Sequence, residues 1–205
     1  PRGDSFEAAK IFERWDPARK IAVQYWPQGE GGDLRMQNPY WIAYRNPRNT
    51  DKKRYMANVS IAFDILPWLN VSGRAKIDNT NSIFTQKLYA SSNTTITEGS
   101  TQGHYTEIRN TDEQIYADVM VNINKTFADN KFSLVANVGA SVNDTKSKEL
   151  SYRGPIREVG IPNMFTVFDL DKEKSRAQKY GWQEQTQSIF ASVEMGYKSM
   201  LYLTV

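Results

Sequence analysis

The feature that most constrains the fold is an alternation of apolar and polar residues over positions 54–78, interrupted by one turn. The apolar members are Val59, Ile61, Phe63 and Ile65 in the first arm and Leu69, Val71, Ala75 and Ile77 in the second; the polar members between them are Asn58, Ser60, Asp64, Asn70, Ser72, Arg74, Lys76 and Asp78. Successive side chains of a strand point to opposite faces, so a period of two predicts two strands, each with one apolar face. Leu66, Pro67 and Trp68 join the arms, and the fixed φ of proline suits a tight turn.

The length and polarity of this hairpin limit where it can reside. Each arm has about ten alternating residues, the length of a tilted strand that crosses a bilayer. The polar face carries charges of both signs and is expected to face water, whereas the apolar face needs a protein core or lipid. No run of 18 apolar residues occurs, so no transmembrane helix is expected.

The same alternation returns further along the chain. It covers residues 113–127, 131–143 and 182–197 and resumes at 201–205, with short turns at 128–130 and 198–199 and long polar connections at 79–112 and 144–181. Within the first connection, 84–90 and 105–109 are expected to extend the strands. Outer-membrane barrels separate short periplasmic turns from long extracellular loops, whereas loops of such length are uncommon in compact soluble domains.

The expected fold class is therefore all-β: a segment of an antiparallel transmembrane β-barrel with short periplasmic turns and long extracellular loops. Residues 1–53 are expected to form an extracellular loop region with short strands at 20–26 and 42–46. Residues 54–205 are expected to form barrel strands and extracellular loops within one larger barrel domain. Aromatic residues near the short turns predict a belt at the membrane interface: Trp68, Phe127, Phe132, Tyr197 and Tyr202.

Composition argues against several classes of function. The chain has no cysteine, which excludes thiolate sites and disulfides within it, and its net charge of +3 is interspersed, so nucleic-acid binding is not expected. The only histidine, His104, falls in a polar connection and is expected to be solvated. Asp169, Asp171 and Glu173 resemble the start of a calcium loop, but Lys174 stands where that loop needs glycine. We expect no catalytic residues, no metal and no cofactor, and hence no enzyme.

Aromatic residues that punctuate the polar segments are the candidate substrate-binding residues. Flat rings stack on sugar faces or pack on peptides, although loop packing and partner contacts also favour Tyr and Trp. The candidates are Trp26, Tyr40, Trp41, Tyr89, Tyr105 and Trp182, and Tyr152 is a further aromatic residue of the same polar segments.

Two motifs carry a resemblance to a known family. The first is Asn38-Pro39-Tyr40-Trp41. The second consists of Arg54, Asn58, Ser60, Asp64, Ile65, Trp68, Leu69, Gly73 and Arg74 at their particular spacing. Together they resemble SusC/RagA-family TonB-dependent outer-membrane transporters. The final residues 201–205 resemble a strand that runs on further in this family, so we expect the chain to be part of a longer protein.

The resemblance implies properties that the alternation alone does not. It implies a barrel of about 22 strands in the cell outer membrane, filled by a plug, with a TonB-binding segment outside this chain. It also implies a SusD-like surface lipoprotein as partner, membrane lipid around the barrel, and import of oligosaccharides or peptides. Asp64, Arg74, Lys76, Asp118 and Glu194 would then face the lumen, where solvation is favoured over a role in the transport path or in plug binding.

Two alternatives remain open from the sequence. One is a soluble all-β carbohydrate-binding module, in which the apolar faces would pack against one another. The other is a barrel that serves as a structural scaffold in an outer-membrane complex.

Overall fold

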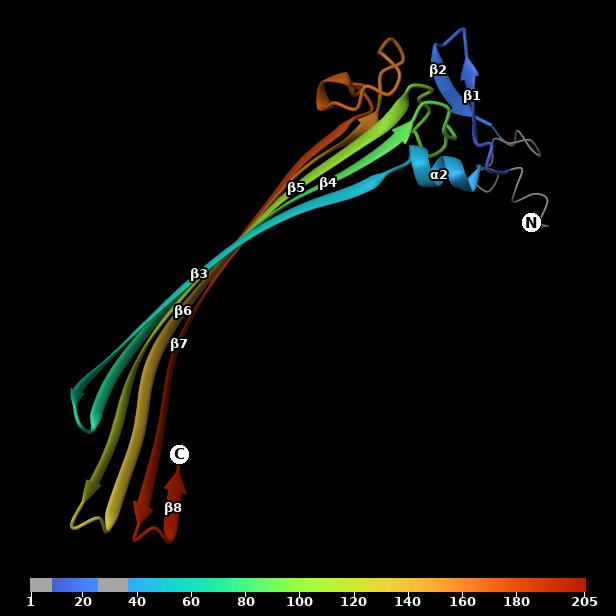
Figure 1. Ribbon diagram of the computed structural model, residues 1–205. Helices are drawn as coiled ribbons and strands as arrows, with labels where there is room; N and C mark the ends of the chain where they lie inside the picture. Colours follow the sequence, from blue (N-terminus) through green and yellow to red (C-terminus); the bar gives the residue numbers. More distant parts are fainter. Residues whose placement is uncertain (1–8, 26–36) are drawn as a thin grey trace. The chain divides into compact units, whose positions relative to one another are not determined.

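The computed structural model of the chain describes residues 9–25 and 37–205, and almost all of its regular structure is β-strand (Figure 1). A small hairpin pairs β1 (Glu13–Asp16) with β2 (Ile21–Gln24), and a helix, α2 (Pro39–Arg45), precedes the main sheet. The main sheet contains β3 (Arg48–Leu66), β4 (Leu69–Tyr89), β5 (Gly103–Phe127), β6 (Phe132–Pro155), β7 (Arg176–Tyr197) and β8 (Leu201–Thr204). A single 3-10 turn, η2 (Val167–Asp169), lies between β6 and β7.

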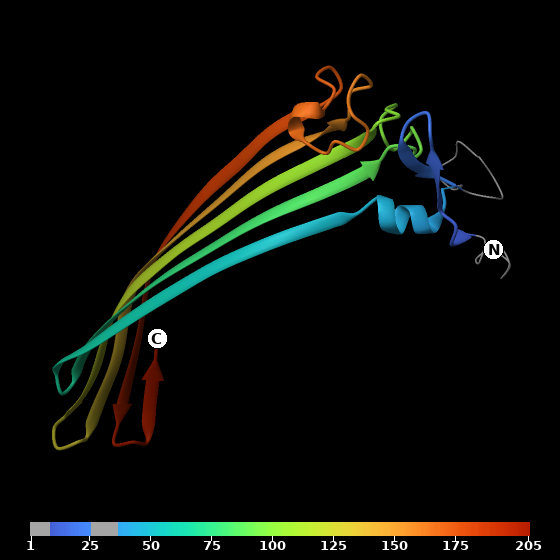
Figure 2. The same ribbon diagram turned by 45° about the horizontal axis from the view of Figure 1, so that its top comes forward.

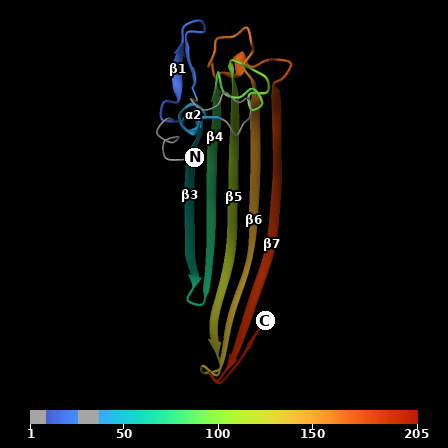
Figure 3. The ribbon, with the colours of Figure 1, turned by 90° about the vertical axis from the view of Figure 1, so that its right-hand side faces the viewer.

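The six strands of the main sheet are hydrogen-bonded in sequence order, β3-β4-β5-β6-β7-β8. Neighbouring strands run in opposite directions, and Figure 3 shows β3 to β7 side by side in that order. In the last pair, Glu194 faces Thr204 and Tyr197 faces Leu201. The all-β, antiparallel fold predicted from the alternation is confirmed, and the sheet is open, with β3 and β8 at its edges.

The tight turns fall where the sequence predicts them. Ala128, Asp129 and Asn130 all have positive φ, as do Lys198 and Ser199. Such left-handed conformations let a chain reverse within a few residues. Pro67 and Trp68 alone separate β3 from β4.

The long connections are shorter than expected. The expected strand extensions are confirmed, because β4 continues to Tyr89 and β5 begins at Gly103, leaving residues 90–102 as the loop. In the second connection, β6 continues to Pro155 and β7 begins at Arg176, so only residues 156–175 lie outside the two strands. The expectation of a loop over all of 144–181 is wrong, because polar side chains occupy a strand as readily as a loop when they have cross-strand partners.

The expectation of a short strand at 42–46 is also wrong, because residues 42–45 belong to α2 and Asn46 is its C-cap (Figure 2). Asn38 is the N-cap residue and its side chain accepts a hydrogen bond from the Tyr40 N–H, while Pro39 stands at the first helical position. Both residues favour a helix start at these positions. Of the strand expected at 20–26, β2 confirms residues 21–24, and residue 26 lies outside the described residues.

The chain divides into two compact units. The loop unit comprises Pro1–Lys52, Ser82–Asn110 and Glu149–Tyr180; the strand unit comprises Lys53–Asn81, Thr111–Lys148 and Gly181–Val205. Most of the buried apolar side chains are in the loop unit: Val23, Trp41, Leu88, Tyr105, Ile156 and Leu170.

The strand unit keeps much of its apolar surface exposed. On β3, the apolar set of the alternation includes Phe63, which is 66% exposed, and on β7 Ile189 is 86% exposed. Within this unit, close packing occurs between neighbouring strands of the sheet. For example, a Cβ added at Gly139 of β6 would collide with the ring of Phe190 of β7. An aromatic ring laid over a glycine of the neighbouring strand covers backbone that has no side chain of its own.

In the part of the chain that the structure describes, no helix has both the length and the apolar character needed to cross a membrane.

Candidate functional site

The Asn38-Pro39-Tyr40-Trp41 motif joins separate segments of the loop unit. Besides capping α2, the Asn38 side-chain amide donates to the backbone carbonyls of Ala9, at 2.9 Å, and Tyr25, at 3.0 Å. The Asn38 backbone N–H donates to the side chain of Gln24 at 2.9 Å. Because Asn38 is fully buried, these bonds satisfy polar groups that have no water to bind. The motif therefore fixes where α2 begins relative to β2.

Trp41 is the largest fully buried side chain among the described residues. Its indole N–H donates to Ser92 Oγ at 3.0 Å, and that hydroxyl donates in turn to Asn46 Oδ1 at 3.1 Å. A tryptophan with its N–H satisfied is stable inside a core. The ring thus ties α2 to the loop at 90–102, which is the loop packing that the sequence left open beside substrate contact.

Tyr105 is also buried, with 5% of its surface exposed. Its hydroxyl donates to Glu107 Oε2 at 2.7 Å, and Arg109 Nε donates to Glu107 Oε1 at 2.6 Å. Burial and the carboxylate beside it raise the pKa of Tyr105 to about 12. Burial pushes the pKa of Glu107 upward, but the hydrogen bonds from Tyr105 and Arg109 outweigh it and hold that pKa below its usual range.

The remaining candidate aromatics occupy different settings. Tyr89 packs against Phe165, with ring centroids 4.9 Å apart, and carries the Arg45 guanidinium 5.4 Å from its ring. Tyr40 and Tyr152 are partly buried in the loop unit, whereas Trp182 belongs to β7 in the strand unit and is 44% exposed. Trp26 lies outside the described residues.

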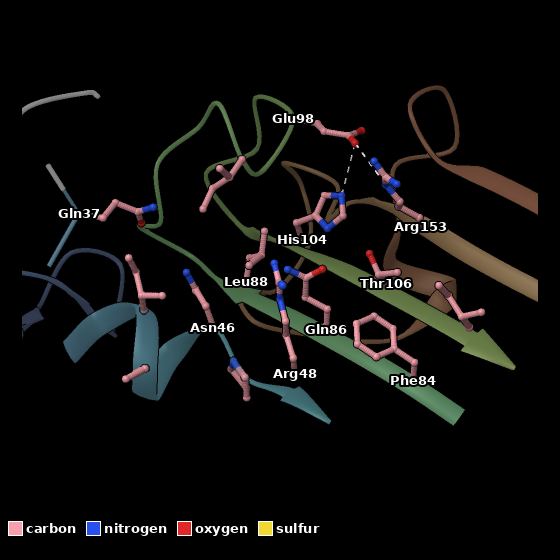
Figure 4. A pocket seen from close by; sticks show the side chains of 15 residues that line it. Gln37, Asn46, Arg48, Phe84, Gln86, Leu88, Glu98, His104, Thr106 and Arg153 are labelled. Atoms are coloured by element: carbon pink, nitrogen blue, oxygen red, sulfur yellow. Dashed lines mark ion pairs between the residues drawn. The ribbon is translucent and has the colours of Figure 1, made fainter. Parts of the chain in front are cut away.

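The loop unit contains a pocket of about 940 Å³, shown in Figure 4. Its apolar wall includes Ile42 and Pro47 and the strand residues Phe84, Leu88 and Ile108. Its polar groups include Arg48, Gln86, Glu98, His104, Thr106 and Arg153. The residues from β4 and β5 alternate along their strands, so each strand presents one face to the pocket. The sequence does not reveal this pocket, because its members come from distant parts of the chain.

His104 is the centre of the polar side of this pocket and only 4% of its surface is exposed, so the expectation of a solvated histidine is wrong. Gly103, just before it, has a φ of 113°, and a Cβ there would lie 2.6 Å from the Leu88 carbonyl oxygen. This glycine lets β5 begin close against β4. The ring of His104 is thereby drawn into the interior of the loop unit.

The charges around His104 are arranged on one carboxylate. His104 Nε2 and Arg153 Nε lie 3.6 and 3.8 Å from the same oxygen, Glu98 Oε1. Burial lowers the pKa of His104, with Arg153 acting in the same direction, and Glu98 opposes the shift. The imidazole is therefore neutral at pH 7, and its Nδ1 has no hydrogen-bond partner among the described residues.

Arg48 brings a second guanidinium to the pocket. With the Gln86 amide turned so that its oxygen faces Arg48, that oxygen lies 3.2 Å from Nε and 3.1 Å from Nη2. No carboxylate of the described residues forms an ion pair with Arg48. The pocket therefore holds two guanidinium groups, one carboxylate and a neutral imidazole, a net charge of +1.

The segment that resembles a calcium loop is held by its own side chains. Asp169 bonds to Arg157 Nη2 at 2.9 Å and to the Thr166 hydroxyl. Asp171 accepts the backbone N–H groups of Glu173 and Lys174. Across residues 9–25 and 37–205, no group of three or more side chains lies together as potential metal ligands.

In the strand unit, the polar face consists of side chains that pair across strands. Arg54 binds Asp78, and Arg74 Nε lies 2.9 Å from Asp118 Oδ2. Amides continue the pattern, with Asn122 donating to Asn70 at 3.1 Å. Solvation alone, the favoured expectation for this face, does not describe Arg74 and Asp118, because they bind each other.

The aromatics near the short turns lie in two clusters. Phe132 and Tyr197 have ring centroids 5.0 Å apart. The Lys125 ammonium stands 4.4 Å from the centroid of Trp68 and 5.5 Å from that of Phe127. Tyr202 is 55% exposed and crosses from β8 to Gly196, its partner in the sheet.

Comparison with known proteins gives a likeness of structure. No family model matches the chain, and no curated protein matches it in sequence. Among solved structures, a chain of the RagAB peptide transporter superposes with a TM-score of 0.70 and 15% sequence identity, over 89% of this chain. The RagAB peptide importer in its "open-open" state gives a TM-score of 0.66 and 14% identity over 89%, and in its "closed-closed" state 0.65 and 16% over 82%.

The likeness concerns only a part of those proteins. The chain spans 18% to 20% of the length of the RagAB chains that it matches. At this identity the comparison shows the fold: the strands of this chain have the arrangement of a stretch of the transporter.

Proposed function

We propose that the chain is part of the barrel wall of a TonB-dependent outer-membrane importer of the SusC/RagA kind. It contributes to the passage of oligosaccharides or peptides and does not change them chemically. TonB would act through a region outside this chain. The likeness to the RagAB peptide transporter supports transport as the role, and the two sequence motifs support the family.

The observation that carries this proposal is the division of the strand unit into two faces. One face exposes large apolar side chains, among them Ile61 at 53%, Val119 at 49% and Ile189 at 86%. The other holds polar side chains bonded across the strands, such as Arg74 with Asp118. A membrane barrel requires this division, since lipid covers one face and the other lines a wet interior.

The loop unit offers a surface for a partner. Residues 156–175 expose Val159 at 99%, Phe168 at 82% and Ile161 at 64%. Apolar side chains gathered on a loop mark contact sites. In the proposed assembly a SusD-like surface lipoprotein covers this loop.

The soluble sugar-binding module is the weaker candidate. It requires the apolar faces of the strands to pack against one another, whereas Phe63 and Ile189 are largely exposed.

Purification from native membranes tests the proposal. The full-length protein, tagged within this chain, is extracted from outer membranes in mild detergent, and its co-purifying proteins are identified. We expect the protein in the outer-membrane fraction with a stoichiometric surface lipoprotein. Recovery in the soluble fraction contradicts the proposal, and recovery in the membrane without uptake of any oligosaccharide or peptide favours the scaffold.

A further inference from the structure

The pocket around His104 contains a hydrogen-bond acceptor, His104 Nδ1, that has no donor among the described residues. Glu98 is an acceptor when ionised, so the proton of the neutral imidazole belongs on Nε2, which faces Glu98 Oε1. The lone pair is then on Nδ1, which is buried and has no partner among the described residues. A buried acceptor left unpaired is costly. Figure 4 shows this nitrogen turned away from Glu98, toward the pocket interior.

The same pocket has a cation without a matching anion. Glu98 lies close to both His104 and Arg153, whereas the partner of Arg48 among the described residues is the neutral amide of Gln86. A guanidinium presents parallel N–H donors that match the two oxygens of a carboxylate. The Gln86 oxygen accepts from Nε and from one N–H of Nη2, so the N–H groups that remain on Nη1 and Nη2 of Arg48 are the pair of donors available at the pocket wall.

The rest of the pocket sets the character of a ligand. Phe84, Leu88 and Ile108 make an apolar wall beside these polar groups. A volume of about 940 Å³ is large enough for a ligand of several linked units. Apolar walls with a few convergent polar groups are typical of ligand sites.

We propose that this pocket binds a carboxylate that stands beside a hydrogen-bond donor, with Arg48 holding the carboxylate and His104 Nδ1 accepting from the donor. Two sources have this chemistry: the C-terminal residue of a peptide, whose donor is an amide N–H, and a uronic acid sugar, whose donor is a hydroxyl. That the pocket selects cargo for import rests on the proposed function. Binding itself does not.

Calorimetric titration of the purified full-length protein in detergent tests the proposal. The probes are N-acetyl-trileucine, its C-terminal amide, and digalacturonic acid. We expect one of the two acids to bind, and the peptide amide to bind at least about tenfold more weakly than the peptide acid if the peptide is the ligand. Arg48→Gln is expected to weaken binding of the acid by about tenfold or more. The control is Arg109→Gln, at an exposed arginine of the same unit outside the pocket, which is expected to leave the affinity for the acid unchanged.

Two substitutions of His104 separate its two nitrogens. His104→Asn places an oxygen acceptor near the position of Nδ1 and gives up the contact with Glu98, whereas His104→Gln keeps a donor near Glu98 and gives up the acceptor. Binding is expected to survive in His104→Asn and to fall by about tenfold in His104→Gln. Urea unfolding of each variant shows whether it is folded. If both variants are folded and lose the same affinity for the acid, the assignment of Nδ1 as the acceptor is contradicted.

The outcomes also distinguish the pocket from the transport role. Binding of the peptide acid identifies a peptide C-terminus as the ligand, and binding of digalacturonic acid identifies a uronic acid. Equal binding of the peptide acid and its amide, or no binding of either acid to folded protein, overturns the proposal. If the protein binds one of the acids but is absent from the outer membrane, the result supports the binding pocket and contradicts the proposed role in import.

Discussion

The two units of this chain handle polar and apolar groups in opposite ways. The loop unit buries a tryptophan and an isoleucine almost completely, Trp41 at 0% and Ile156 at 1% exposure. It also buries polar groups, and Asn38 and Ser92 have partners for them. The strand unit leaves apolar side chains exposed, with Ile189 at 86%. One sequence thus contains a unit with a core of its own and a unit whose apolar face needs a cover from outside the chain.

This difference shows what an alternating sequence does and does not specify. In the strand unit, alternation alone decides the faces, and several polar side chains find a partner on the next strand, as Arg74 does with Asp118 and Asn122 does with Asn70. In the loop unit, contacts join distant segments, as when Trp41 reaches Ser92. The predictions below test this contrast, from the largest expected effect to the smallest.

Replacing the buried tryptophan tests whether the loop unit has its own core. Trp41→Ala is expected to reduce the free energy of unfolding by about 3–5 kcal/mol, because it leaves a cavity and removes the indole N–H that donates to the Ser92 hydroxyl. Trp182→Ala, at a site that is 44% exposed, is expected to cost less than half as much. Urea unfolding in detergent measures both, and limited proteolysis should show cleavage within 90–102 in the first variant alone. Equal losses would mean that the loop unit has no core of its own.

A charge placed on either face of β5 tests the strand unit. Val121→Arg, on the apolar face, is expected to destabilise the membrane-inserted protein by about 2–4 kcal/mol, since it places a cation against lipid. Asn122→Arg, one residue on, points to the polar face and is expected to be tolerated. Folding into lipid vesicles, followed by urea titration, compares the two. A larger loss from Asn122→Arg would reverse the assigned faces.

The cross-strand pair of Arg74 and Asp118 offers a smaller effect. Each single variant, Arg74→Ala or Asp118→Asn, is expected to lower stability, more for Arg74→Ala because it leaves the Asp118 carboxylate, with a side chain only 2% exposed, without its partner. The double variant is expected to lose less than the sum of the two. A double-mutant cycle in urea measures this coupling, and strict additivity would show that the pair contributes nothing.

The pH dependence of the loop unit is expected to follow His104. Its pKa in the folded protein lies below the ordinary 6.5, so the unfolded chain binds a proton first as the pH falls. Its contribution to stability is therefore complete above about pH 6.5 and is lost as the pH falls from there through the folded-state pKa. The pKa values of Glu107 and Glu158 are lowered from 4.5, so these two groups add a second loss of stability only when the pH falls below about 4.5.

His104→Asn is the control for this prediction. It should remove the loss of stability that begins near pH 6.5 and leave the more acidic one in place. Unfolding curves at closely spaced pH values measure both. An unchanged profile would assign the first loss to another group.

The sequence predicts the strand unit far better than the loop unit. Alternation predicts the hairpins and places the turns at Pro67, Asp129 and Lys198 without knowledge of any contact. Strand extension through 144–155 was missed because its polar residues resemble a loop until a neighbouring strand supplies partners, as Asp112 does for Ser147. The alternation of apolar and polar residues repeats every two positions along a strand, so a short stretch of sequence is enough to predict it.

In the loop unit, one missed element had a readable signal and one did not. Asn38 followed by Pro39 is a helix start, and giving it more weight than the apolar residues after it would have predicted α2. The burial of His104 had no such signal. It depends on Glu98 and Arg153, and nothing in the sequence shows that Arg153 comes near the histidine.

The most direct test of the account is whether the two faces of β5 meet different surroundings. Spin labels are placed singly at residues 117–123 of the full-length protein in lipid vesicles, and their accessibility to oxygen and to a water-soluble nickel complex is measured. The account predicts a period of two, with oxygen favoured at the odd positions, including Val119, and nickel at the even ones, including Asn122. Equal accessibility of both faces to the nickel complex would contradict it, because the apolar face would then be in water.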